Sequence, residues 1–389
     1  MYKIQTLNNI SVKGLDRLPR DRYGVASEIG HPDAILVRSF KMHDMEIPDS
    51  VVAIGRAGAG VNNIPVDRMS QRGVVVFNAP GANANAVKEL VLAGMFLAAR
   101  NICAGWEYVR RLEGDDAEVS RQVEAGKKKF AGFELPGRTL GVIGLGAIGV
   151  KVANAAQALG MKVIGFDPGI TVGRAWELES DVLQAHSVDE VMSRADFVTV
   201  HVPLNDHTAN LINADRVRMM PEGGVVLNFS RAGIVDDAAV LAGLDENHLT
   251  AYVNDFPTNA TRHHPRCITL PHLGASTREA EENCAILVAD QVKDYLENGN
   301  VRNSVNFPEV VMPRSEKGER LAVVNANVPN MLGQISTALA GAGLNIDDMY
   351  NKSRGDLAYT LVDVEGAIPD HLADSVLAID GVLAVRIIR

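Results

Sequence analysis

The feature that most constrains the fold is a glycine-rich turn between an apolar run and a helix-forming stretch. Residues 139–143 (TLGVI) lead into residues 144–149 (GLGAIG), and a helical pattern then continues to Gly160. A glycine at that point is the expected C-terminal cap. A second apolar run, KVIGF, follows at once and ends before Asp167. Strand, helix and strand in this order predict a right-handed βαβ unit in a parallel sheet.

The same turn has the spacing of a dinucleotide-binding site. Glycines let the backbone approach a pyrophosphate, whose charge is met by free N–H groups and the positive end of the helix. An acidic residue about 20 residues further on accepts hydrogen bonds from ribose hydroxyls and repels a 2′-phosphate. The turn therefore predicts NAD as the cofactor rather than NADP. The residues expected to contact it are Gly144, Gly146, Ala147, Ile148, Gly149 and Asp167.

The rest of the chain alternates in the same way. Short β-branched runs separated by polar or glycine-rich segments extend from residue 34 to residue 76, and further apolar runs occur up to residue 272. This rhythm predicts an α/β protein with a doubly wound parallel sheet. After residue 272 a long amphipathic helix is predicted, opened by a capping box at Ser276 and Glu279 and closed near Gly299.

The last 70 residues differ, because their pattern is strand, helix, two strands, helix and strand. That order is the βαββαβ of a ferredoxin-like domain. The predicted domains are a substrate-binding domain (residues 1–100 plus 275–305), a Rossmann-type NAD-binding domain (101–274), a linker (306–318) and the C-terminal domain (319–389).

Composition narrows the class of protein. The chain has 389 residues, 47% of them hydrophobic and 22% charged, with a net charge of −10. Nucleic-acid and anionic-membrane partners need clustered Lys and Arg, so neither is expected. The N-terminus lacks the pattern of a secretory signal, and cytoplasm is the predicted location. Cys103, Cys267 and Cys284 have no metal-ligand spacing and are expected as small buried side chains; no metal site is predicted.

Four further stretches resemble the D-2-hydroxy acid dehydrogenases: residues 78–91 (NAPGANANAVKELV), 201–208 (HVPLNDHT), 219–237 (MMPEGGVVLNFSRAGIVDD) and 270–277 (LPHLGAST). The resemblance covers roughly residues 34 to 300. It implies an NAD-dependent oxidoreductase with a Rossmann-type domain and a flavodoxin-like substrate domain. It also implies further cofactor contacts at His201, Val202, Pro203, Thr208, Ser230, Arg231, Asp255, His272 and Gly274.

The resemblance assigns the catalytic roles to Arg231 and His272. The planar guanidinium of an arginine can hold a substrate carboxylate and polarise the neighbouring carbonyl oxygen. A histidine suits proton exchange with the substrate hydroxyl, because imidazole changes charge near working pH. Arg231 lies in NFSRAG and His272 in LPHLGAST, where the family has these two groups.

The chain departs from the family at the residue that holds the histidine. The family motif is DVFxxEP, and this chain has residues 254–260 as NDFPTNA, so Asn259 stands at the glutamate position. An amide oxygen can fix the imidazole tautomer but adds no negative charge. Two alternatives stay open. In the first, Asn259 orients His272 and the enzyme favours neutral or alkaline pH. In the second, another acid such as Asp255 reaches the imidazole ring.

Two arginines in the N-terminal part of the chain suggest a phosphorylated substrate. Arg38 and Arg56 match positions that line the substrate cleft in the phosphoglycerate-oxidising branch of the family, and a phosphate plus a carboxylate needs several cationic donors. The expected substrate contacts are Arg38, Ser39, Arg56, Ala57, Gly58, Arg231 and His272. The predicted reaction is oxidation of 3-phospho-D-glycerate. The alternatives are another D-2-hydroxy acid, reduction of 2-oxoglutarate, or an NAD-sensing protein with little turnover.

The C-terminal domain resembles an ACT regulatory module. In the related enzymes such modules pair across subunits and bind L-serine, and Asn325, Asn327 and Asn345 are the candidate effector contacts here. The alternative is a module that only assembles the oligomer. The family resemblance predicts a homodimer or homotetramer.

Overall fold

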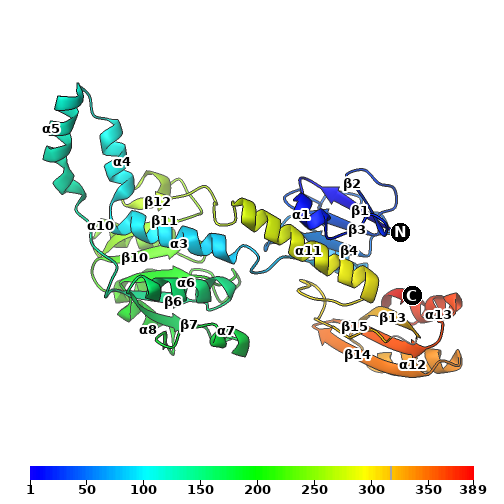
Figure 1. Cartoon of the computed structure of the whole chain (residues 1–389). Helices are drawn as coiled ribbons and strands as arrows, with labels where there is room; N and C mark the ends of the chain where they lie inside the picture. Colours follow the sequence, from blue (N-terminus) through cyan, green and yellow to red (C-terminus); the bar gives the residue numbers. More distant parts are fainter. Residues whose placement is uncertain (316–317) are drawn as a thin grey trace. The chain divides into compact units, whose positions relative to one another are not determined.

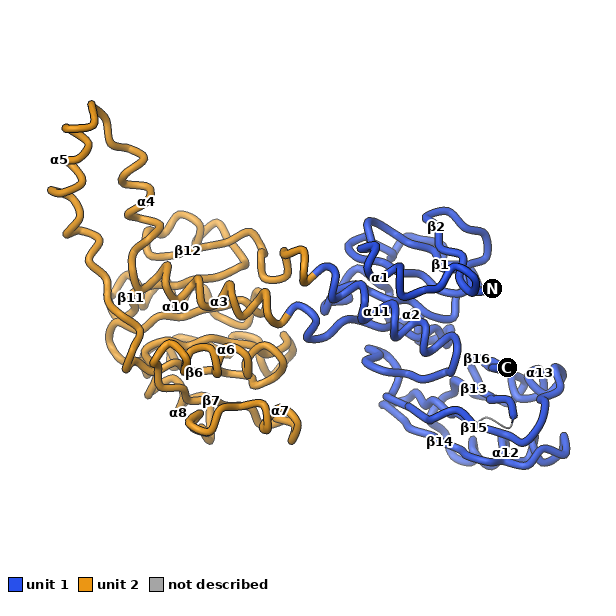
Figure 2. Tube along the Cα trace, in the orientation of Figure 1, with its two compact units in different colours: residues 1–83, 281–389 blue, residues 84–280 orange. Residues whose placement is uncertain are grey.

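The computed structural model describes residues 1–315 and 318–389 and divides the chain into two compact units (Figure 2). Unit 1 comprises residues 1–83 and 281–389, and unit 2 comprises residues 84–280. The predicted linker, residues 306–318, includes residues 316 and 317, which lie outside the described residues. Phe307, Val310 and Met312 are buried, and residues 301 and 310 pair in an antiparallel bridge. The described part of this segment therefore packs into unit 1 instead of forming an exposed linker.

Unit 2 is built on a parallel sheet of seven strands within the described residues. The order is β12-β11-β10-β9-β6-β7-β8, which contains the 3-2-1-4-5-6 arrangement of a Rossmann-type sheet. Alternate residues of β6 enter two different cores, because helices cover both faces: Val142 lies in one core and Ile143 in the other. The strands are β6 (Thr139–Ile143), β7 (Lys162–Phe166), β8 (Leu183–Gln184), β9 (Phe197–Val200), β10 (Gly224–Asn228), β11 (Leu249–Asn254) and β12 (Cys267–Thr269).

The helices of unit 2 lie between these strands or before them (Figure 1). They are α3 (Ala84–Ala99), α4 (Ile102–Arg110), α5 (Asp116–Gly126), α6 (Ala147–Ala158), α7 (Val172–Trp176), α8 (Val188–Arg194), α9 (Ala214–Met219) and α10 (Asp237–Asp245), with short 3-10 turns at Lys127–Phe130 and Thr261–His263. Helices α4 and α5 project away from the sheet of this unit (Figure 1).

Helix α3 corrects the predicted domain boundary at residue 100. Val87, Val91 and Met95 are buried in the same core as Val142 of β6. The helix also touches Phe229 and Val253 at Gly94, where an added Cβ would come within 2.9 Å of the Phe229 ring. Because this apolar face is buried against the seven-stranded sheet, the division falls before α3 rather than after it. At the other end it falls at residue 280 rather than 274.

Unit 1 begins with a parallel sheet in the order β2-β1-β3-β4-β5, the flavodoxin-like arrangement. Its strands are β1 (Tyr2–Leu7), β2 (Tyr23–Ala26), β3 (Ala34–Val37), β4 (Ala53–Arg56) and β5 (Val75–Phe77), with short helices α1 (Val12–Leu15) and α2 (Val66–Gln71). The long helix α11 (Arg278–Asn298) packs closely on this sheet, since a Cβ on Gly55 would lie 2.7 Å from the Val288 side chain.

The start of α11 differs by one residue from the predicted capping box. The hydroxyl oxygen of Thr277, not that of Ser276, accepts a hydrogen bond from the Ala280 N–H at 3.1 Å. Thr277 is therefore the N-cap, and Glu279 is not at the third helical position where a box would need it. The predicted end is confirmed, because Gly299 has φ +72° and its N–H bonds the Tyr295 carbonyl.

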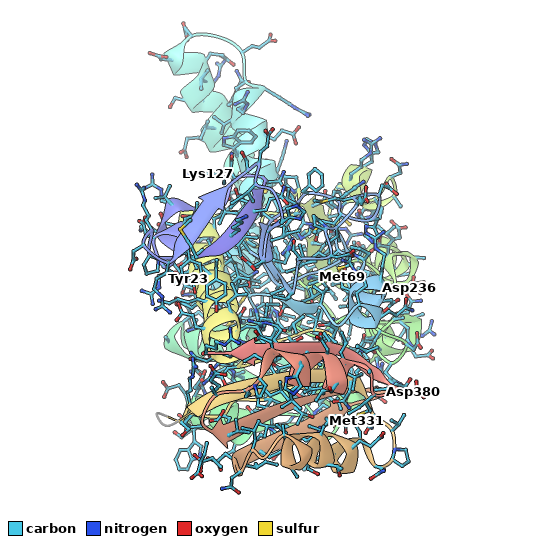
Figure 3. The ribbon with its side chains drawn as sticks, turned by 90° about the vertical axis from the view of Figure 1, so that its right-hand side faces the viewer. Tyr23, Met69, Lys127, Asp236, Met331 and Asp380 are labelled. Carbon is cyan, nitrogen blue, oxygen red and sulfur yellow. The ribbon has the colours of Figure 1, made fainter. Side chains whose placement is uncertain are left out.

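The C-terminal domain, also in unit 1, is an antiparallel sheet in the order β14-β15-β13-β16, as expected for βαββαβ. Its elements are β13 (Gly318–Ala326), α12 (Met331–Gly341), β14 (Ile346–Arg354), β15 (Leu357–Glu365), α13 (Asp370–Leu377) and β16 (Val382–Ile388). In Figure 3 Met331 marks the start of α12, and Asp380 marks the turn into β16. Leu321 and Val323 of β13 pack under the helices, whereas Ala322 and Val324 join the core around α11.

A buried ion pair ties this domain to the end of α11. The Arg320 guanidinium donates to both carboxylate oxygens of Asp363, at 2.6 and 2.8 Å. It also donates to the carbonyls of Asn298, Met312 and Pro313. With all its donors engaged, the cation is tolerated at 0% exposure.

Among the described residues no helix is both long and apolar enough to span a lipid bilayer. Cys284 is buried and Cys267 is partly buried, but Cys103 is exposed, because α4 projects into solvent instead of packing on the sheet.

Candidate active site

The three glycines of the turn after β6 are required for three different reasons. Gly144 has φ +94°, and a Cβ there would lie 2.6 Å from the His201 carbonyl oxygen. Gly149 faces the turn so closely that its Cβ would lie 1.9 Å from the Gly144 carbonyl oxygen. Gly146, at the start of α6, has no atom within 4 Å of its Cβ position. The turn is thus tight at its ends and open at Gly146, where the sequence predicts that a pyrophosphate would approach.

Asp167, at the end of β7, is fixed by the same turn. Its Oδ2 accepts the Leu145 N–H at 2.8 Å, and its Oδ1 accepts the Gly169 N–H at 2.8 Å. A carboxylate oxygen can accept more than one hydrogen bond, so both oxygens keep capacity for ribose hydroxyls. The predicted pairing of glycine turn and acidic residue is therefore assembled in unit 2.

A buried ring nitrogen lies next to this turn. His201 follows β9, its N–H bonds the Ile143 carbonyl, and its Nε2 lies 3.0 Å from the Thr199 hydroxyl. Its Nδ1 is buried without a hydrogen-bond partner. Burial lowers the pKa of His201 to about 3, so the imidazole is neutral at neutral pH. An unpartnered polar atom beside an open glycine turn fits a site that a polar cofactor completes.

The loop predicted to continue the cofactor site is stabilised mainly by its own side chains. The Thr208 hydroxyl donates to the Pro203 carbonyl at 2.5 Å and accepts the Asn205 N–H at 2.9 Å. Ser230, after β10, donates its hydroxyl to the Val202 carbonyl at 2.6 Å. These bonds link the ends of neighbouring strands β9 and β10, so at least these two hydroxyls shape the loop.

Arg231 follows at the end of β10. Its carbonyl accepts the side-chain amide N–H of Asn228 at 2.9 Å, and its guanidinium donates to the Ser230 carbonyl at 2.7 Å. The side chain is partly exposed and forms no ion pair with a carboxylate among the described residues. Its backbone is therefore fixed by the buried Asn228, while the charge remains available to an anionic ligand.

His272 lies in a turn after β12, with φ +57° and an exposed side chain. Its N–H bonds the Asp255 carbonyl at 3.1 Å. The Phe256 ring contacts the imidazole edge to face, with 5.0 Å between ring centroids and an interplanar angle of 61°. Because β10, β11 and β12 are adjacent and parallel, Arg231 and His272 lie at the same edge of the sheet.

Neither proposed partner of His272 bonds to its ring. Asn259 is exposed, and no hydrogen bond joins it to His272 within the described residues. Asp255 is 1% exposed, and its two oxygens accept the N–H groups of Leu273 and Gly274, both at 2.8 Å. Asp255 and Gly274, both predicted to contact the cofactor, are thus hydrogen-bonded to each other.

Asn254 is a site residue that the sequence reasoning missed. It ends β11, is 1% exposed, and its Oδ1 accepts the Phe256 N–H at 3.0 Å. Its amide nitrogen Nδ2 has no hydrogen-bond partner. The signal was present in the sequence, since Asn254 stands at the aspartate of DVFxxEP.

The predicted anion-binding residues of unit 1 lie at the carboxyl ends of β3 and β4. The Arg56 Nε donates to the Arg38 carbonyl at 3.1 Å, and the Arg38 guanidinium pairs with Glu281 of α11 at 2.5 Å. A Cβ on Gly58 would lie 1.8 Å from an Arg56 nitrogen, so glycine there makes room for the guanidinium. Glu281 was not predicted, because it lies 243 residues from Arg38 in the chain.

The predicted effector residues are only partly brought together. Asn325 and Asn327 line a cavity of about 210 Å³ at the start of α12, with Asn330 and Asn351. Asn325 is 1% exposed and donates to the Ala326 carbonyl, so its side chain is committed to the fold. Asn345 is not among the residues lining this cavity and lies 3.5 Å from Glu365.

Comparison with known proteins places this geometry in a family. Residues 92–274 match the model of the D-isomer specific 2-hydroxyacid dehydrogenase, NAD binding domain. The D-3-phosphoglycerate dehydrogenase of Haemophilus influenzae is 32% identical over 357 residues, which cover 88% of this chain and 83% of that protein. The enzyme of the same name from Methanocaldococcus jannaschii is 33% identical, and the match covers 87% of this chain but only 62% of the relative.

A solved structure of a related enzyme aligns with this chain. The NAD⁺-bound 3-phosphoglycerate dehydrogenase of Entamoeba histolytica aligns with a TM-score of 0.60 and 26% identity, covering 78% of this chain and 98% of that one. The chain belongs to the D-isomer specific 2-hydroxyacid dehydrogenases, and the family model that it matches is that of their NAD-binding domain. The predicted NAD cofactor is confirmed at the level of the family.

Proposed function

We propose that this chain oxidises 3-phospho-D-glycerate to 3-phosphonooxypyruvate, the first step of L-serine biosynthesis, in the cytoplasm. The cationic pair Arg38 and Arg56 carries the choice of substrate. Their strand ends supply two guanidinium groups beside the turn at Gly58, and a phosphate needs such donors. The named relatives are phosphoglycerate dehydrogenases, which supports the same choice.

In this proposal the two groups at the edge of the seven-stranded sheet perform the chemistry. NAD⁺, when bound, accepts a hydride from the carbinol carbon. Arg231, whose guanidinium has no carboxylate partner among the described residues, holds the substrate carboxylate and polarises the reacting oxygen. His272 accepts the hydroxyl proton at its exposed imidazole and returns it in the reverse direction.

The test is a steady-state assay of NAD⁺ reduction with 3-phospho-D-glycerate. Turnover with kcat/KM at least about 10⁴ M⁻¹s⁻¹ is expected, a usual value for an enzyme on its own substrate. His272→Gln should lower kcat by about 10²-fold to 10⁴-fold, the range for loss of a general base. A preference for an unphosphorylated hydroxy acid or for 2-oxoglutarate would identify the other family chemistry.

A homo-oligomer formed through unit 2 is part of the proposal. Phe96, Ile102, Trp106 and Val109 lie along α3 and α4 with 40%, 45%, 62% and 51% of their surface exposed. Several exposed large apolar side chains on neighbouring helices are typical of an association face. Light scattering should give a dimer or tetramer, and Trp106→Glu should dissociate it.

Serine regulation through the C-terminal domain, as an ACT module, is also part of the proposal. The cavity near Asn327 supports an effector, while the committed side chain of Asn325 supports the alternative of a purely assembling domain. Measuring the assay with and without L-serine separates the two. No change up to millimolar serine would favour assembly alone.

A further inference from the structure

A buried carboxylate lies directly behind the turn that presents His272. Asp255 is 1% exposed, and its two oxygens accept the N–H groups of Leu273 and Gly274 at 2.8 Å each. The fit is close, since a Cβ on Gly274 would lie 3.3 Å from Asp255 Oδ2. In the proposed chemistry this carboxylate contacts neither substrate nor the imidazole ring, and its burial needs another reason.

The backbone of His272 supplies that reason. A φ of +57° is costly for a residue with a Cβ, by roughly 1–2 kcal/mol, and persists only where neighbouring structure imposes it. The N–H of His272 bonds the Asp255 carbonyl, and the N–H of Leu270 bonds the Asn254 carbonyl. Together with the carboxylate bonds these contacts hold the chain on both sides of His272. Hydrogen bonds from N–H to a carboxylate are stronger than those to neutral acceptors.

The neighbouring residue fixes the ring as well. Phe256 follows Asp255 directly, and its ring meets the imidazole edge to face at 5.0 Å between centroids. Residues 255 and 256 therefore set both the backbone and the ring of His272. The sequence position supports a special role, because the motif DVFxxEP has an apolar residue where this chain has Asp255.

We propose that Asp255 is the positioning residue for His272, acting through the Leu273 and Gly274 amides. It directs the imidazole through the backbone, which compensates for the missing side-chain partner at Asn259. The inference rests on the proposed acid–base role of His272. Its test nevertheless has one arm that is independent of turnover.

The experiment compares the full-length chain with Asp255→Asn. The amide keeps one oxygen acceptor but turns an NH₂ group toward the second backbone N–H, so one of the two bonds is lost. The readout is the NMR signal of the His272 imidazole in ¹³C-histidine-labelled protein, which is assigned by its loss in His272→Gln. The Phe256→Leu variant lacks the aromatic ring that shifts this signal and gives its position without that contact. In Asp255→Asn the signal should move toward that position. The kcat should fall about 100-fold, as for an ångström-scale misplacement, with the NAD⁺ Kd within about threefold of the wild type.

Asp236→Asn is the matched control. Asp236 also accepts two backbone N–H groups, from Ala238 and Ala239, at the start of α10. Asn is a good N-cap, so this variant should leave the His272 signal and kcat unchanged. An unchanged His272 signal in folded Asp255→Asn, or an equal change in Asp236→Asn, would overturn the proposal.

Failure of a variant to fold and absence of turnover in the wild type are two further outcomes, and each has a defined meaning. If Asp255→Asn does not fold, Asp255→Ser, which introduces no buried NH₂ group, is measured instead. Failure of both variants to fold would contradict the proposal, because a residue that only positions His272 is not required for the fold of the seven-stranded sheet. If the wild type does not turn over 3-phospho-D-glycerate, the proposed function fails, while the imidazole signal still decides the role of Asp255.

Discussion

The two parallel sheets both carry candidate ligand-binding groups at the carboxyl ends of neighbouring strands, but the groups are of different kinds. In unit 2 the turn after β6 offers backbone N–H groups, and glycines at positions 144, 146 and 149 provide the space. In unit 1 the ends of β3 and β4 offer the guanidinium groups of Arg38 and Arg56. The first site depends on volume and backbone conformation, whereas the second depends on charge. Substitutions should therefore affect the two sites in different ways.

The largest effect is expected from Gly144→Ala. The added Cβ would distort the turn, because residue 144 has a φ of +94° and the Cβ would lie 2.6 Å from the His201 carbonyl oxygen. We expect the NAD⁺ Kd, measured by calorimetry, to rise at least about 100-fold, with a loss of roughly 1–2 kcal/mol in unfolding free energy. Gly146→Ala should weaken binding without loss of stability, because its Cβ has open space.

Gly173→Ala is the control for both variants, since it also places a Cβ in open space, on α7. It should leave the Kd unchanged and should raise the stability by up to about 1 kcal/mol, because alanine favours a helix more than glycine does. Wild-type affinity in Gly144→Ala would show that the turn is not the cofactor site.

Arg56→Ala tests the charged site. Loss of a hydrogen bond to a charged ligand costs about 1.5–3 kcal/mol, so KM for 3-phospho-D-glycerate should rise roughly 10-fold to 100-fold. The NAD⁺ Kd should stay constant, and the effect should shrink at high salt. Arg68→Ala, which removes a guanidinium bonded to the Met42 and Met45 carbonyls of the same unit, should leave KM unchanged. Equal KM shifts in both variants would argue against a specific role for Arg56.

His201, beside the glycine turn of unit 2, should make the stability of the folded chain sensitive to acid. Burial lowers the pKa of His201 to about 3, against about 6.5 in the unfolded chain. Below pH 6.5 the unfolded chain therefore binds a proton that the folded chain does not, and stability falls as pH decreases toward 3. Between pH 7 and 5 this histidine should account for about 2 kcal/mol of lost stability. In denaturant titrations His201→Leu should remove that part of the pH dependence, and the exposed His207→Leu should keep it.

A smaller effect is expected from Asn259→Glu. A carboxylate near His272 favours the imidazolium, so the acidic limb of the pH–rate profile should move upward by up to about one pH unit, with activity retained. Asn259→Gln, which adds length but no charge, should leave the limb in place. An unchanged profile in the glutamate variant would mean that residue 259 does not face the histidine.

The contrast between the two sites also explains what the sequence could predict. Residues 144–149 were identified because a turn with this conformation admits few residues other than glycine. The doubly wound parallel sheet and the βαββαβ order of the C-terminal domain were predicted from the alternation of strands and helices, whereas the strand orders within the sheets come from the structure. Asp255 was named as a possible partner of the His272 ring, but its bonds to the backbone N–H groups could not be predicted, and neither could the Arg38–Glu281 pair, because side-chain directions are set by packing. Helix α3 was misassigned for a similar reason, since its apolar face does not reveal which sheet it covers.

The central claim is that the glycine turn and Asp167 form an NAD site. The most direct measurement is calorimetric titration of the full-length chain and of Asp167→Ala with NAD⁺ and NADP⁺. The carboxylate held by Leu145 and Gly169 should favour NAD⁺ at least about 10-fold in the wild type, and Asp167→Ala should remove most of that preference. Equal or tighter binding of NADP⁺ by the wild type would contradict the account.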